Sequence, residues 1–108
     1  MTVTQFVARL QGSLANRYRH YHVLEKGAVT AFTIQYEAEI DGEWRAIVRY
    51  DTAHGRPHKD LLHPDGTETK EEFPYYTHLE VLTLGQNDIR KNWKQYRARY
   101  EKEMRKRK

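Results

Sequence analysis

Cysteine is absent from this 108-residue sequence, and so is any long apolar run. The lack of cysteine excludes disulfides, thiolate nucleophiles and cysteine-ligated zinc or iron–sulfur sites. Without an apolar run of about 20 residues, and without a signal-peptide pattern, we expect a soluble, cytoplasmic protein with no membrane partner. P-loop, dinucleotide-fingerprint, G-x-S-x-G and H-E-x-x-H motifs are also missing, so nucleotide-dependent transfer, serine hydrolysis and zincin chemistry have no support.

The charge of the chain is distributed unevenly along its length. The net charge is +4, but ten lysines and arginines against two glutamates give residues 89–108 a net charge of +8, which leaves −4 for residues 1–88. A basic segment of this kind favours polyanions or an acidic protein partner. The alternative is a solvated helix that ends in a basic tail over residues 105–108.

Apolar and polar residues alternate from Val29 to Asp51, on both sides of Asp41-Gly42. This pattern predicts a half-buried antiparallel hairpin. Strict alternation with a bulge at the turn would pair Ile40 with Trp44, and further along Ile34 with Tyr50. Tyr50 then lies in the core.

The flanking segments complete the predicted fold. We expect a short helix over residues 1–14, a strand over 17–25 and an edge hairpin over 58–73. Of two capping boxes, at Thr77 and Thr83, Thr83 is favoured because Gly85 weakens a longer helix, and residues 77–82 are then extended or irregular. The chain is therefore predicted to be one α+β domain over residues 1–108, an antiparallel sheet of four to five strands with a long basic C-terminal helix on one face.

The loop that follows the hairpin is rich in groups that can carry chemistry. RNA cleavage without a metal needs an acid, a base and cations near the phosphate, and histidine serves either proton-transfer role near neutrality. We predict His54 and His58 as the acid/base pair, Arg49 and Arg56 as phosphate contacts and Asp51 as the group that orients a histidine. His63 is a substitute candidate for the acid/base pair. The predicted nucleic-acid contacts are Lys59, Lys94, Arg97, Tyr75 and Tyr76.

Two other interpretations of these residues stay open. Asp51, His54, His58 and His63 have donor atoms at intervals that suit a divalent metal, but the interleaved cations oppose metal binding, so no metal or cofactor is predicted. Alternatively the loop residues are structural, with Arg49 paired to Gln35 or Glu37.

One stretch carries a family resemblance. It reads R-Y-D-T-A-H-G-R-P-H from Arg49 to His58, and D-I-R-K-N-W-K-Q-Y-R-A-R-Y follows later. The chain resembles, over residues 28–100, a family of small prokaryotic domains of unassigned function. More loosely, the strand end and loop are similar to TumE-like toxins of toxin–antitoxin pairs, although Gly55 stands where that pattern has a second histidine.

The resemblance implies a toxin that cleaves single-stranded RNA and is neutralised by an antitoxin protein. It implicates Arg49, Tyr50, Asp51, Ala53 and His54. The alternative function is a non-catalytic nucleic-acid or protein-binding module that uses the basic helix, and a third is a metal-dependent nuclease.

Overall fold

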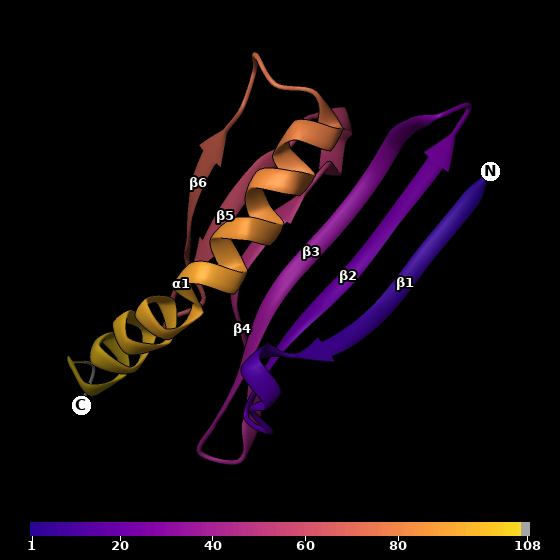
Figure 1. Cartoon of the computed structure of the whole chain (residues 1–108). Coiled ribbons are helices and arrows are strands. Elements are labelled where there is room, and N and C mark those ends of the chain that lie inside the picture. The colour runs from indigo at the N-terminus through magenta and orange to yellow at the C-terminus, as the bar shows by residue number, and fades with distance from the viewer. Residues whose placement is uncertain (107–108) are drawn as a thin grey trace.

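A computed structural model describes residues 1–106 as one antiparallel sheet with a long helix on one of its faces (Figure 1). The six strands follow one another in sequence order across the sheet. They are β1 (Thr2–Arg9), β2 (Asn16–Glu25), β3 (Ala28–Ile40), β4 (Glu43–Asp51), β5 (His58–Leu62) and β6 (Glu68–Glu72), and the helix is α1 (His78–Lys106). The α+β prediction is confirmed, with six strands in place of four to five. Two residues of the predicted basic tail, 107 and 108, lie outside the described residues.

The additional strand is β1, in the segment where the sequence predicts a helix. All eight of its residues pair with β2, from Thr2 opposite Leu24 to Arg9 opposite Arg17. The helical spacing of its apolar residues is too short a pattern to decide the structure, and its β-branched valines and threonines favour a strand. The helix predicted over residues 1–14 is therefore wrong.

The β3–β4 hairpin has a tighter turn than predicted. Asp41 and Gly42 form a two-residue loop with positive φ angles of 55° and 79°, which sets Ile40 opposite Glu43. The bulge lies within β4 at Ile47, and beyond it Ile34 pairs with Tyr50 as predicted. The predicted pairing of Ile40 with Trp44 is wrong because the bulge lies at Ile47 and not at the turn.

Helix α1 begins six residues earlier than predicted. Thr77 caps it, because its Oγ1 accepts a hydrogen bond from the Glu80 amide at 3.1 Å and its own amide donates to Glu80 Oε1 at 2.8 Å. Gly85 continues the helix because it packs closely on the sheet. The Thr83 cap and the extended segment over 77–82 are therefore wrong.

The core lies between α1 and the middle strands β3 and β4. Tyr50 is buried there as predicted, and so are Ile89, Trp93 and Tyr100 of the predicted helical stripe. The Trp93 ring meets the Tyr36 ring edge to face at a centroid distance of 6.1 Å. No helix within residues 1–106 is long and apolar enough to span a bilayer.

Candidate functional site

Alternation along β4 and β5 separates the predicted site residues between the two faces of the sheet. Tyr50 and its partner Lys59 face α1, so the neighbouring Asp51 and His58, which pair with each other, point to the face that α1 does not cover. We call this the helix-free face. The predicted site thus lies behind the sheet as seen from the helix.

His58 lies between two carboxylates on the helix-free face. Its Nε2 is 2.9 Å from Asp51 Oδ1 and 3.3 Å from Asp60 Oδ2. Its Nδ1 lies 3.3 Å from the Arg56 carbonyl oxygen, and Lys70 Nζ lies 3.0 Å from Asp60 Oδ1. We call Asp51, His58 and Asp60 the His58 cluster; His58 and Asp60 are buried.

The arrangement of the His58 cluster is compatible with two kinds of chemistry, metal binding and proton transfer. One ligand atom from each of its three residues lies within 4.8 Å of the others, and carboxylate oxygens with an imidazole nitrogen suit a divalent cation. The ammonium group of Lys70 already balances part of the carboxylate charge. The Asp51–His58 contact is also the arrangement by which a carboxylate orients a histidine for proton transfer.

The other predicted catalytic residues are not gathered around His58. His54 lies in the turn Ala53–Gly55 with a φ of 64°, exposed and without a polar partner within residues 1–106. His63 lies beyond the opposite end of β5, where its Nδ1 is 2.7 Å from Glu103 Oε1 of α1 and its Nε2 is 2.7 Å from Thr69 Oγ1. The structure therefore brings Asp51 to His58, but it does not pair His58 with His54 or His63.

Arg49 belongs to a polar network that crosses the helix-free face. Its Nε donates to Gln35 Oε1 at 2.7 Å, and Gln35 in turn donates to Glu37, which also binds Arg17 and Arg19. Burial alone would raise the pKa of the Glu37 carboxyl, but hydrogen bonds from Arg19, Arg17 and Gln35 outweigh burial and lower it. Arg49 is thus held within a structural network.

Two of the predicted nucleic-acid contacts are engaged by the protein itself. Lys59 Nζ lies 2.7 Å from the Tyr96 hydroxyl and 3.6 Å from Asp88 Oδ2, under the helix. Arg97 donates to the carbonyls of Ala15 and Glu39 at 3.2 and 3.1 Å. These two cations fasten α1 to the sheet.

The remaining cations of α1 form an exposed face. At about 100° per residue they fall within an arc of about 160° opposite the packed stripe. All six are exposed and have no ion-pair partner within residues 1–106: Arg90, Lys91, Lys94, Lys102, Arg105 and Lys106. We call them the basic face. Between residues 90 and 106 the one acidic residue on this arc is Glu101, which is paired with Arg97 at 3.4 Å.

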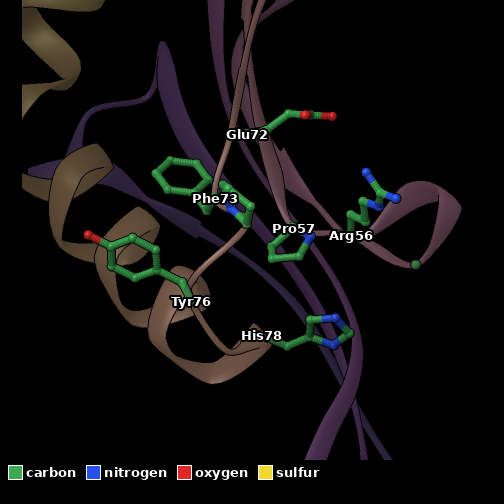
Figure 2. A pocket seen from close by; sticks show the side chains of 8 residues that line it. Arg56, Pro57, Glu72, Phe73, Tyr76 and His78 are labelled. Atoms are coloured by element: carbon green, nitrogen blue, oxygen red, sulfur yellow. The ribbon is translucent and has the colours of Figure 1, made fainter.

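A cavity of about 470 Å³ opens between the loop before β5 and the connection from β6 to α1 (Figure 2). Arg56 and Glu72 lie along one rim, and the Tyr76 ring lies on the side of the helix. Tyr75 and Tyr76 are 94% and 49% exposed. The cavity therefore combines an ionic rim with an accessible aromatic ring.

A polar cluster beneath the helix is absent from the residues predicted from the sequence. Asp88 Oδ2 accepts hydrogen bonds from the hydroxyls of Tyr50 at 2.7 Å and Tyr96 at 2.6 Å, and Asn92 donates to Oδ1. Burial would raise the pKa of Asp88, but these hydrogen bonds and the charge of Lys59 lower it. The spacing of Asp88, Asn92 and Tyr96 at every fourth residue is the signal in the sequence that could have found it.

Fold and site together define a small α+β domain in which a basic helix covers one face of an antiparallel sheet and a His/Asp cluster occupies the other. The chain belongs to the DUF7718 family, a domain of unknown function that matches residues 1–106. The match confirms the prediction of a family of unassigned function. No curated protein and no solved structure matches the chain significantly.

Proposed function

We propose that this chain binds single-stranded RNA through the basic face of α1. The observation that carries the proposal is the set of six exposed cations on one side of the helix, unpaired within residues 1–106. Each cation that contacts a phosphate releases counterions, which is the main source of sequence-independent affinity for nucleic acid. Surface lysines and arginines that only solubilise a helix are usually interspersed with acidic partners, and between residues 90 and 106 this arc has a single acidic residue.

Exposed aromatic residues favour a single strand over a duplex. Tyr75 and Tyr76 precede the first turn of α1, and Tyr75 is almost fully exposed. Unpaired bases stack on such rings, and stacking contributes about 1–3 kcal/mol per base. The tyrosines would hold bases at one end of the helix, while the basic face holds phosphates along it.

The test is fluorescence anisotropy with a labelled, mixed-sequence single-stranded RNA. Replacing Lys91 and Lys94 by glutamine is expected to weaken binding by roughly tenfold, because two phosphate contacts are lost. The matched control replaces Arg9 of β1 and Lys26 of the β2–β3 turn, which are exposed, and removes the same net charge. Equal weakening in both pairs would contradict a site on the helix.

RNA cleavage by a TumE-like toxin is the second candidate function, and the 2.9 Å contact between Asp51 and His58 favours it. In this hypothesis Asp51 orients the imidazole, and the substrate takes the place of the Arg56 carbonyl at Nδ1. Nδ1 then accepts the 2′-hydroxyl proton as that oxygen bonds to phosphorus, and the bond to the 5′-oxygen breaks with a proton supplied by water. An antitoxin with an acidic surface would cover the basic face. We place this second because the cluster and the basic face lie on opposite faces of the sheet.

Cleavage is tested with the same RNA in excess EDTA. Metal-independent cleavage would persist in EDTA and be lost in both Asp51→Asn and His58→Gln, whereas His22→Gln, a histidine of β2, retains it. Cleavage that stops in EDTA and returns with Mn²⁺ or Mg²⁺ would instead assign the His58 cluster to a metal. If the two cluster variants cleave like the wild type, the cluster is not the active site.

A further inference from the structure

We propose that β1 pairs with β1 of a second copy of this chain, so that two sheets join into one continuous sheet. β1 lies at one edge of the sheet and, within residues 1–106, pairs only with β2, while β6 lies at the other edge (Figure 1). An edge strand presents a row of backbone donors and acceptors that another strand can satisfy. The inference concerns assembly and goes beyond the proposed RNA binding.

The two edges of the sheet differ in how they resist pairing. Four of the five residues of β6 are charged, and charged residues protect an edge from association. β1 has one charged residue, Arg9, at its end. Its apolar side chains Val3, Phe6 and Val7 are 48%, 43% and 49% exposed. β1 is therefore the edge that is open to a partner strand.

Symmetry restricts the register of a β1–β1 pair. Two antiparallel edges are related by a two-fold axis perpendicular to the sheet, so opposed residues lie on the same face. With Gln5 on the axis, Val3 of each copy meets Val7 of the other, and Phe6 meets Thr4. Shifting the axis by one residue in either direction would place a valine opposite Gln5. The register centred on Gln5 therefore pairs valine with valine on each side of the axis and leaves Gln5 opposite its own copy.

The charge distribution of the chain permits a second copy at this edge. The axis keeps both α1 helices on one face, and each helix packs on β3 and β4. Five interstrand spacings of about 4.8 Å separate the two copies of β3, about 24 Å in total. This exceeds the Debye length of about 8 Å at physiological salt, so the two basic faces repel each other weakly. Their cations would then line one common surface.

The dimer is expected to be weak. Eight residues of β1 are available from each copy, whereas a standard stable interface has about 20–30 residues a side. The monomer is therefore expected to fold without its partner, and association is expected to need protein concentrations in the micromolar range or above.

Sedimentation-velocity ultracentrifugation over a range of protein concentrations tests the proposal. Wild type is expected to shift from monomer to dimer as concentration rises. Gln5→Lys, which places two cations opposite each other on the axis, is expected to weaken dimerisation by about tenfold. Gln95→Lys makes the same change on an exposed position of α1 and is expected to leave dimerisation intact.

A mixture supplies the decisive comparison. Gln5→Lys and Gln5→Glu are each expected to dimerise poorly alone, and their equimolar mixture is expected to restore the dimer as a mixed species. Circular dichroism melts confirm that each variant is folded. A wild type that stays monomeric at all concentrations, equal effects at Gln5 and Gln95, or a mixture without recovery would overturn the proposal.

Discussion

Gly85 of α1 lies against the ring of Tyr50 in β4: a Cβ atom at position 85 would stand 2.8 Å from Tyr50 Cγ and 2.8 Å from Ile34 Cδ1. At an exposed helical position, replacing glycine by alanine stabilises a protein by roughly 1 kcal/mol. Here the overlap reverses the sign, because two buried side chains would have to move. Gly85→Ala is expected to destabilise the protein by about 1–3 kcal/mol in urea unfolding.

Ala98 supplies the reciprocal control, because it is exposed on the same helix. Ala98→Gly is expected to cost about 1 kcal/mol from helix propensity alone. A Gly85→Ala variant as stable as the wild type would mean that α1 does not pack on Tyr50 at this distance.

Asp88 is the only carboxylate bound by both Tyr50 and Tyr96 within residues 1–106, and its loss leaves the two hydroxyls without their acceptor and Lys59 without a carboxylate beside it. Asp88→Ala is expected to lower the free energy of unfolding by about 2–4 kcal/mol. Tyr96→Phe removes one hydroxyl and is expected to cost about 1 kcal/mol. Chemical denaturation of the two single variants and the double variant measures the coupling, and strictly additive losses would show that the contact is not formed.

Arg97 separates structural from binding roles on the helix. Because it donates to the carbonyls of Ala15 and Glu39, Arg97→Gln is expected to lower thermal stability, at a cost of about 1–3 kcal/mol. A lysine ammonium lacks the planar fork that presents Nη1 and Nη2 to two separate carbonyls, so Arg97→Lys is expected to restore little. Lys94→Gln on the basic face should leave the melting temperature unchanged. An Arg97→Gln variant that melts like the wild type would place Arg97 among the free cations.

Glu37 makes the free energy of unfolding depend on pH. Its carboxyl has a lowered pKa in the folded protein, so its contribution is fully present above the unfolded-state value of 4.5 and is lost as pH falls through the folded-state value. Glu37→Gln is therefore expected to be less stable than the wild type at pH 7, with a difference that shrinks below about pH 4. Denaturation curves at several pH values test this, and a constant difference would contradict the ionic network.

The fold could be predicted wherever side-chain periodicity is long. The alternation through Tyr50 and the stripe through Trp93 placed the hairpin, the helix and their shared face. The bulge at Ile47 could not be predicted, because it depends on pairing with a neighbouring strand. The strand β1 was missed because, over so short a segment, the helical spacing of the apolar residues competes with the strand preference of the β-branched ones. Trp44, which the bulge moves out of the core, instead packs beneath the Arg17 guanidinium at 3.8 Å.

The site was predictable only in part for the same reason. Asp51 ends β4 and His58 begins β5, with a short loop between them, so their proximity follows from the pairing of these two consecutive strands. Asp60 joins them through alternation along β5, a strand with few apolar residues to reveal its phase. The contacts of the Lys59 and Arg97 side chains between α1 and the sheet depend on where α1 crosses the sheet, which no local signal in the sequence determines.

The salt dependence of RNA binding tests the central claim most directly. Affinity is measured by anisotropy between about 50 and 200 mM salt, and each phosphate contact adds about −0.7 to the slope of log affinity against log salt for a single strand. We predict a steep negative slope for the wild type that becomes shallower by about 1.4 when Lys91 and Lys94 are replaced, and is unchanged when Arg9 and Lys26 are replaced. A flat slope, or the same slope in both pairs of variants, would contradict RNA binding by the basic face.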